Sequence, residues 1–343
     1  MLIIDGHLDL AWNAIALGRD ITQPLAVIRA LEGDVPVYGA GVATVSLTSL
    51  RTAGVRAAIA TIFAAPHSEH QPDGYHTAEE AYAQGTAQLR YYQQMEDNGE
   101  IRIIRTRQQL AETIAGEGTT PGVVLLLEGA EPLRTPADLM EFYAAGVRIV
   151  GPAWHATRYA GGTGEPGPLT EIGVELLQEM ARMGVALDIS HLAEEACTQA
   201  FALFRGFIIA SHANARAITP VERNLTDAQL RHIADRNGII GLVLYNRFIR
   251  HSWSEKDGKD AVSLNHLLEH ARYIATTIGA KHLALGSDMD GGLGRDDIPC
   301  ELDSCADYTK ISDGLVKSGF TDSEIAGIMG GNWARVLDQL LPS

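Results

Sequence analysis

Six histidine and carboxylate side chains in this sequence follow closely on short apolar runs. They are His7, Asp9, Glu128, His191, His212 and Asp288. Leu2-Ile3-Ile4 precedes the first pair, and the apolar residues 123–127 lead directly into Glu128. A carboxylate in such a position is costly to bury unless it is paired or bound to a cation. The placement therefore points to metal chemistry at the ends of buried strands.

Imidazole and carboxylate groups together form a nitrogen and oxygen site that suits Zn²⁺ or Mn²⁺. These side chains are numerous enough to hold two ions, and Glu128 is best placed to bridge them. Two cations held roughly 3.5–4 Å apart lower the pKa of a bound water and polarise a carbonyl oxygen, which is the chemistry of amide or ester hydrolysis. Taken singly, each residue also has an ordinary interpretation, as a hydrogen-bonded core histidine or a salt bridge at a rim.

The elements that precede these residues must bring them together. Short apolar runs alternate with helical stretches, which indicates buried parallel strands. We predict eight strands, with a further short one at 101–104 outside the count: 2–6, 55–64, 122–128, 147–151, 185–190, 207–211, 238–244 and 282–287. In a (β/α)8 TIM barrel all strands end on one face, so distant residues converge there. We therefore predict one (β/α)8-barrel domain over residues 1–343, with extra C-terminal helices at about 304–318 and 322–339.

Two connections are predicted as loops, one from the first strand to about residue 54 and a Gly/Pro-rich one at 160–168. The second contains Gly162-Thr163-Gly164-Glu165-Pro166-Gly167, which matches the G-x-G-x-x-G pattern of dinucleotide-binding turns. Pro166 lacks a backbone N–H, and the spacer to the next helix is too long for a tight phosphate turn. We therefore predict a mobile loop over the site. Elsewhere, Thr226 and Thr321 begin capping boxes that mark helix starts.

Composition excludes several classes of protein. The net charge is −16 and no run of Lys or Arg stands out, which argues against nucleic acid as a partner. No apolar stretch approaches the ~20 residues that a membrane helix needs. The N-terminus enters a strand at once, which predicts no signal peptide. The cysteines are an odd, scattered set, Cys197, Cys300 and Cys305, which indicates a reducing compartment, the cytoplasm, without a disulfide framework.

Seven short motifs occur along the chain in the following order: Asp5-Gly6-His7-Leu8-Asp9, Leu127-Glu128-Gly129, Asp188-Ile189-Ser190-His191, Ser211-His212, Arg223-Asn224, Gly286-Ser287-Asp288-Met289-Asp290-Gly291 and Gly331-Asn332. In content and order they resemble the motifs of membrane (renal-type) dipeptidases, a family of the amidohydrolase superfamily. The resemblance extends from residue 5 to about residue 335. It implies a (β/α)8 barrel that holds a binuclear zinc centre.

By this resemblance, His7 and Asp9 would bind one zinc ion, and His191 and His212 the other. Glu128 would bridge the two ions. In many relatives of the superfamily a barrel lysine, modified to a carbamate, forms this bridge, but the dipeptidase family does not use it. The sequence agrees, because Glu128 stands where the bridge is needed.

The resemblance also assigns three residues to the substrate. His155 would contact it and steady the tetrahedral intermediate, as a donor aimed at a developing oxyanion can. Arg223 would bind the substrate carboxylate through its forked guanidinium. Asp288 would take a proton from the bridging water and pass it to the leaving amine. The same carboxylate could hold the free ammonium of the substrate.

The leading hypothesis is a zinc-dependent dipeptidase that cleaves free dipeptides, L,D-dipeptides included, with a metal-bridging hydroxide as nucleophile. A second is a hydrolase of the same barrel that acts on an N-acyl amino acid or a cyclic amide, since Arg223 favours a carboxylate without deciding between these substrates. A third is a metal-dependent binding protein without turnover. The expected partner is a small-molecule dipeptide. A homodimer is the habit of the family, and the residues leave the oligomeric state open.

Overall fold

Eight parallel strands form the centre of the fold. The computed structural model describes residues 1–33, 41–68, 71–116 and 118–343, and the elements named below belong to this part of the chain. The eight strands are β1 (Ile3–Leu8), β2 (Val55–Phe63), β4 (Gly122–Glu128), β5 (Val147–Gly151), β8 (Ala186–Asp188), β9 (Ile208–Ile209), β10 (Ile240–Leu242) and β11 (Leu283–Leu285). The first six form one continuous parallel ladder in that order.

The last two strands complete the ring. β10 pairs in parallel with β11, and a parallel bridge between Ala210 and Ile240 links β10 to the chain just after β9. On the other side, the backbone N–H of Asp288 donates to the carbonyl oxygen of His7 at 3.2 Å. The arrangement is a (β/α)8 barrel, which confirms the predicted fold class. Because the strands run in one direction, their carboxyl ends meet at a single mouth.

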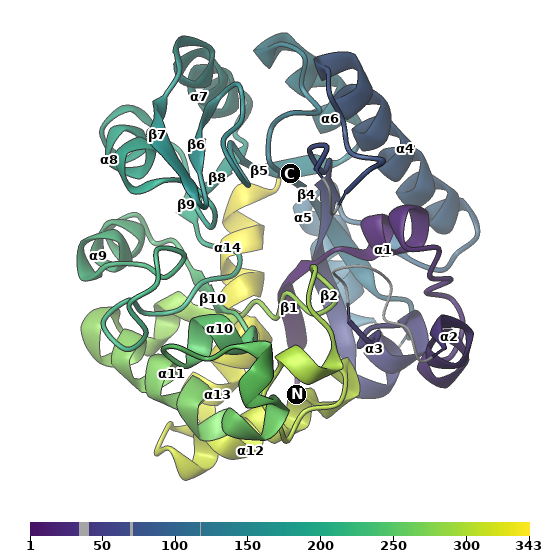
Figure 1. Cartoon of the computed structure of the whole chain (residues 1–343), viewed down its shortest axis with the longest axis vertical. Helices are drawn as coiled ribbons and strands as arrows, with labels where there is room; N and C mark the ends of the chain where they lie inside the picture. The colour runs from purple at the N-terminus through teal and green to yellow at the C-terminus, as the bar shows by residue number, and fades with distance from the viewer. Residues whose placement is uncertain (34–40, 69–70, 117) are drawn as a thin grey trace.

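Helices surround the strands (Figure 1). In chain order they are α1 (Leu10–Ala16), α2 (Leu25–Glu32), α3 (Leu47–Ala53), α4 (Ala78–Asp97), α5 (Arg107–Ala115), α6 (Leu139–Ala145), α7 (Glu171–Met183), α8 (Glu194–Leu203), α9 (Asp227–Asp235), α10 (Asn246–Ile249), α11 (Leu264–Ile278), α12 (Tyr308–Lys317), α13 (Asp322–Ala326) and α14 (Asn332–Leu340). The predicted capping boxes at Thr226 and Thr321 are confirmed as the starts of α9 and α13. Among the described helices, none combines the length and apolar character that a membrane crossing requires.

One buried cluster fills the barrel interior. It contains one or two small or aliphatic side chains from most of the strands, among them Ile4, Ile59, Leu126, Ile149, Ala186, Ile209 and Ala284. Trp333 of α14 belongs to the same cluster and donates from Nε1 to the carbonyl oxygen of Leu285 at 2.7 Å. A Cβ on Gly6 would lie 2.4 Å from the Trp333 ring. Glycine in β1 is therefore needed for this close approach.

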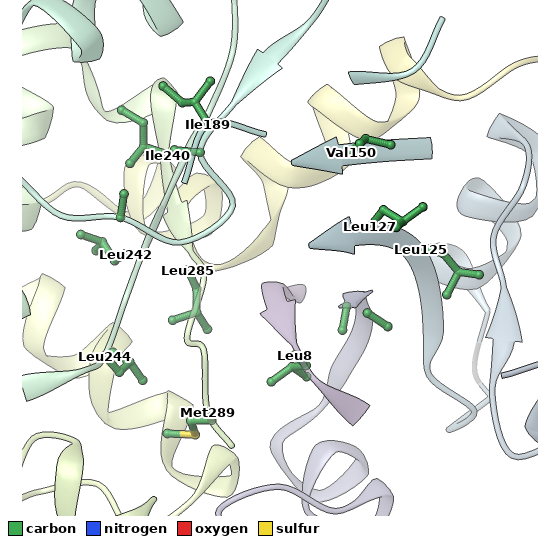
Figure 2. Packing of buried hydrophobic residues seen from close by; sticks show 14 of the residues in the cluster. Leu8, Leu125, Leu127, Val150, Ile189, Ile240, Leu242, Leu244, Leu285 and Met289 are labelled. Carbon is green, nitrogen blue, oxygen red and sulfur yellow. The ribbon is translucent and has the colours of Figure 1, made fainter. Parts of the chain in front are cut away.

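A second, larger cluster contains the side chains that point to the other face of the strands. Figure 2 shows part of it, including Leu8 from β1 and Leu125 and Leu127 from β4. Successive side chains of a strand point to opposite faces, so Leu126 belongs to the interior cluster instead. The next position on that interior face is Glu128. The period of two along β4 therefore directs this carboxylate into the mouth of the barrel.

The segment from the first strand to residue 54 is not the long loop predicted from the sequence. It contains α1, α2 and α3, and residues 34–40 lie outside the described part of the chain. Both α1 and α3 are only seven residues long. Two turns are too few for a helical period to be recognised in a sequence, so the prediction was wrong here.

Two further predictions need correction. Residues 160–168 form an antiparallel hairpin of β6 (Ala160–Gly162) and β7 (Glu165–Leu169), not a loop. The helix predicted at 322–339 is divided into α13 and α14 by a π-helical turn at Gly327–Gly331, whose three glycines weaken the preference for the α-helix. The short strand predicted near 101–104 is confirmed as β3 (Arg102–Ile103), which pairs with β4 outside the eight strands of the barrel.

Candidate metal centre and substrate cavity

The candidate metal ligands lie together at the mouth of the barrel. Three of them are in a strand or directly after one: His7, Asp9 and Glu128. The others each lie three residues beyond the ends of β8, β9 and β11: His191, His212 and Asp288. All are buried except His191, which is partly exposed. The predicted convergence of these side chains is therefore present in the structure.

Glu128 lies at the centre of the group, and the two oxygens of its carboxylate face different histidines. Its Oε2 lies 3.4 Å from Nε2 of His7. Its Oε1 lies 3.1 Å from Nε2 of His191 and 3.7 Å from Nε2 of His212. Those two histidine nitrogens are 3.0 Å apart. Each carboxylate oxygen thus faces a different set of imidazole nitrogens, which is the arrangement that a bridging ligand needs.

A second set of potential ligands surrounds His7. Its Nε2 lies 3.8 Å from Oδ2 of Asp9 and 3.8 Å from Oδ1 of Asp288. Within the described residues this buried Nε2 has no hydrogen-bond partner. A buried polar atom without a partner is unfavourable. Coordination of a cation would satisfy it, and the nitrogen and oxygen donors around it suit zinc.

The charges of the site fit two divalent cations. Burial raises the pKa of Asp9 to about 7, and Glu128 adds to this shift. Burial also raises the pKa of Asp288, against the attraction of His7 and with the support of Asp9 and Glu128. For His7, burial opposes the charged form, but the surrounding carboxylates, Glu128 above all, raise its pKa to about 10. Three buried carboxylates thus repel one another, and bound cations would relieve this repulsion.

Ser211 orients two of the histidines through their other ring nitrogens. Its Oγ lies 3.0 Å from Nδ1 of His7 and 2.8 Å from Nδ1 of His212. The same hydroxyl donates to Oδ2 of Asp188 at 2.5 Å, so it is left to accept from the two imidazoles. A proton on Nδ1 leaves the lone pair of Nε2 free for a metal. The Asp188–Ser211 pair therefore directs both Nε2 atoms into the site.

The structure places His155 and Arg223 on separate sides of this group. His155 follows β5 and lines the cavity above the carboxylates. Arg223 is buried, and its Nη2 lies 2.5 Å from Nε2 of His212 and 3.1 Å from the His212 carbonyl oxygen. Burial lowers the pKa of Arg223 to about 10. Among the described residues, its buried Nε and Nη1 have no hydrogen-bond partner, but Arg223 is not one of the residues that line this cavity.

A cavity of about 290 Å³ opens directly over these groups. Its floor includes Asp9, Glu128, His191 and Asp288. Its described walls are mainly aromatic or aliphatic: Trp12, Phe63, Ala65, Trp154, Tyr245, Phe248 and Leu293. The volume is near the lower end of the range for small-molecule sites. The cavity thus combines a polar, titratable floor with apolar walls, and it has room for a ligand of a few residues at most.

Comparison with known proteins identifies the family. The sequence profile described as membrane dipeptidase (peptidase family M19) matches residues 1–341. The chain belongs to the membrane dipeptidase family. The resemblance inferred from the motifs is thereby confirmed, and with it membership of a family described as dipeptidases.

Curated relatives match part of the chain. An uncharacterized protein in the pqqA 5′ region of Klebsiella pneumoniae is 36% identical over 211 residues, which are 58% of this chain and 74% of that protein. An uncharacterized dipeptidase of Schizosaccharomyces pombe is 30% identical over 227 residues, 62% of this chain and 52% of that protein. The alignment thus spans about half the length of the yeast relative.

Solved structures with the same fold match the whole chain. Dipeptidase AC, a metallopeptidase of this family, has a TM-score of 0.84 at 24% identity, with 100% of this chain and 99% of that chain covered. A metallopeptidase of Rhodobacter sphaeroides, solved with a phosphinate mimic of the dipeptide L-Ala-D-Ala, has a TM-score of 0.83 at 23% identity, with 99% of each chain covered. These structures support the assignment of the barrel fold.

Some features of the site had no signal in the sequence. Ser211 was noted as part of the Ser211-His212 motif, but its contacts with His7 and Asp188 were not predicted. Thr61 on β2 donates to Oδ1 of Asp9, but a threonine inside an apolar run does not stand out. The apolar walls of the cavity come from the end of β2 and from the helices and loops that follow five different strands, so no local pattern marks them. Such residues are recognised only once their neighbours in space are known.

Proposed function

We propose that this chain is a zinc-dependent dipeptidase with a binuclear centre, and that it hydrolyses the amide bond of free dipeptides. The observation that carries the proposal is the position of Glu128, whose Oε2 faces His7 while its Oε1 faces His191. One buried carboxylate between two sets of ligands can hold two cations near each other. Membership of the dipeptidase family supports the same reaction.

His7 and Asp9 would hold one zinc ion, and His191 and His212 would hold the second. Glu128 would bind both ions. When bound, the two ions would lower the pKa of a water molecule and polarise the carbonyl group of the substrate. The chain keeps the imidazoles ready for this task, because the Nδ1 atoms of His7 and His212 are engaged by Ser211 and their Nε2 atoms point inward.

Two side chains at the cavity would act on the substrate itself. Asp288 would accept the proton of the attacking water and return it to the leaving amine, as a general base and then a general acid. His155 would be protonated on both ring nitrogens for this step, and its Nε2–H would donate a hydrogen bond to the carbonyl oxygen as negative charge develops there. Both line the cavity, so both are accessible to a substrate.

Arg223 would bind the free carboxylate of the dipeptide. Its Nε and Nη1 lack partners among the described residues, and a forked guanidinium suits a carboxylate. Asp288 could pair with the free ammonium group at the other end. Recognition of both termini would limit the substrate to two residues, and the cavity volume of about 290 Å³ agrees with a small ligand. The apolar walls favour dipeptides with apolar side chains over those with charged ones.

The proposal predicts two zinc ions per chain and turnover of unblocked dipeptides. Metal content would be measured by mass spectrometry of purified, zinc-loaded protein. The panel would contain Leu-Phe, Ala-D-Ala, Lys-Asp, N-acetyl-Phe and a cyclic amide. We expect the highest kcat/KM for the apolar free dipeptides, L,D forms included, because the solved Rhodobacter relative holds a mimic of such a dipeptide.

Other results on this panel would point to other functions. A preference for N-acetyl-Phe or the cyclic amide would contradict dipeptidase activity and favour a different amide hydrolase on the same barrel. Bound metal without turnover of any amide would favour a metal-dependent binding protein. Fewer than two ions in the active protein would contradict the binuclear centre.

Arg223→Lys tests recognition of the carboxylate. Lysine keeps the charge but loses the fork. Hydrogen bonds to charged groups contribute about 1.5–3 kcal/mol, so we expect KM for a free dipeptide to rise roughly 10–100-fold while kcat changes less. The corresponding dipeptide amide, which has no carboxylate, is expected to change little. Equal losses for the two substrates would show that Arg223 acts elsewhere. Arg247→Lys, at an exposed position of α10, is the matched control.

Three further properties belong to the proposal. We propose that residues 1–343 form one domain, because β1 and β11, from opposite ends of the chain, lie side by side in the barrel.

The cysteines Cys197, Cys300 and Cys305 are all free, which supports a reducing compartment such as the cytoplasm. A homodimer, the habit of the family, would be tested by sedimentation velocity.

A further inference from the structure

The glycine-rich turn of the β6–β7 hairpin is held between two loops at the mouth of the barrel. On one side, the backbone N–H of Thr163 donates to the carbonyl oxygen of Trp154 at 2.9 Å. On the other, the N–H of Ala193 donates to the carbonyl oxygen of Gly161 at 3.0 Å, and Gly162 forms an antiparallel bridge with Leu192. The turn is thus attached both to the loop that carries His155 and to the loop that carries His191.

Glycine is required at this turn for close packing of backbones. A Cβ on Gly162 would lie 2.3 Å from the carbonyl oxygen of His155. A Cβ on Gly161 would lie 2.3 Å from the backbone nitrogen of Gly167 on the other strand of the hairpin. Gly164 has a φ of 73°, which glycine adopts without strain. The motif that resembles a dinucleotide-binding turn therefore serves to bring Thr163 close to both loops.

From this position Thr163 contacts two histidines of the site, His155 and His191. Its carbonyl oxygen lies 2.7 Å from Nδ1 of His155, which must therefore carry a proton and donate. Its Oγ1 lies 3.0 Å from Nδ1 of His191 and 3.4 Å from the His191 carbonyl oxygen. If the hydroxyl donates to that carbonyl, its oxygen accepts from Nδ1–H of His191. In both rings Nε2 is then the nitrogen that is free to face the cavity and the metal centre.

We propose that Thr163 is a positioning residue that orients a metal ligand and a substrate-binding histidine at the same time. Its hydroxyl fixes the tautomer and ring orientation of His191, and its backbone carbonyl holds the His155 ring with Nδ1–H toward the hairpin and Nε2 toward the cavity. The inference rests on the proposed function, because it assigns His191 to zinc and His155 to the substrate. It gives the hairpin a role that the family assignment does not supply.

Thr163→Val tests the hydroxyl. Valine has the same branched shape, so the hairpin should fold, but it cannot accept from His191. We expect one of the two zinc sites to lose about 10–100-fold in affinity, as is usual when the partner of a metal-binding histidine is removed. Affinity would be measured by competition with a chelator of known zinc affinity. The second site, which contains His7 and Asp9, is expected to keep its affinity.

Thr163→Ser is the matched control, because it restores the hydroxyl without the methyl group. We expect the zinc affinities of Thr163→Ser to stay within about threefold of those of the unmodified protein. For Thr163→Val, we expect kcat/KM to recover when zinc is saturating. Two unchanged affinities in Thr163→Val, or equal losses in Thr163→Ser, would overturn the role of the hydroxyl. If the unmodified protein bound no zinc at all, the proposed function would fail instead.

The role of the carbonyl is tested by the tautomer of His155. In zinc-loaded protein labelled with ¹⁵N-histidine, we expect the His155 signal to report a protonated Nδ1, and His155→Gln would assign that signal. A neutral ring protonated only on Nε2 would overturn this part of the inference. The measurement is independent of turnover, so it separates orientation of the ring from any loss of activity.

Discussion

Glu128→Gln is expected to lower the zinc content from two ions to one or none per chain and to reduce kcat/KM by roughly 10³-fold or more. The amide has nearly the shape of the carboxylate, but it has one oxygen in place of two and no charge. In the native protein the two oxygens face His7 at 3.4 Å and His191 at 3.1 Å. A single substitution therefore weakens both sets of ligands. Zinc content and steady-state kinetics would be measured on the same preparation.

The control for Glu128→Gln is Glu175→Gln, at an exposed position on α7. It makes the same chemical change away from the site and is expected to leave zinc content and kcat/KM unchanged. Circular dichroism would show whether both variants are folded. Retention of two zinc ions in folded Glu128→Gln, with kcat/KM within about tenfold of the unmodified protein, would contradict the bridging role.

Asp288→Asn is expected to reduce kcat by roughly 10²–10⁴-fold while about two zinc ions stay bound. The amide cannot accept and return a proton, but it keeps an oxygen near His7 and the volume of the side chain. Asp288 has a φ of 59°, and asparagine is one of the few residues that tolerate this backbone conformation. The substitution therefore removes the proton acceptor without adding backbone strain. Single-turnover kinetics would show whether the chemical step is the one that slows.

Zinc content separates this result from that of Glu128→Gln. If Asp288→Asn loses metal as well as activity, then Asp288 acts as a ligand, which its distance of 3.8 Å from His7 would also allow. If kcat falls less than about tenfold, another group transfers the proton. Asp313→Asn, at an exposed position of α12, makes the same change away from the site and should have no effect.

The strands of the barrel were predictable because each is a short apolar run. β4 is buried along its whole length and reads as continuous apolar residues that end in Glu128. The first strand and its two candidate ligands, His7 and Asp9, were found in the same way. The hydrophobicity of a segment and the period of its apolar residues are local properties of a sequence. Strands and the residues that end them can therefore be predicted without knowledge of the fold. The short helices α1 and α3 lack such a signal and were missed.

The partners that orient the site were not predictable in the same way. Ser211 and Asp188 are 23 residues apart, and Thr163 acts on His191 across 28 residues. Hydroxyl groups of this kind are common in any sequence, and only their distance from an imidazole nitrogen distinguishes them. The glycine-rich segment around Thr163 illustrates the problem, because its sequence pattern indicated a loop while its contacts define a hairpin fixed at both sides.

The sequence by itself determined the order of strands, the residue type at each strand end and hence the family. It also indicated which side chains could bind metal, because the type of each residue is given directly by the sequence. Only the tertiary structure decided that Glu128 divides its two oxygens between His7 and His191, and that Thr163 reaches two histidines at once. Such distances result from the closure of the barrel and the packing of loops on one another, which depend on contacts between residues far apart in the chain.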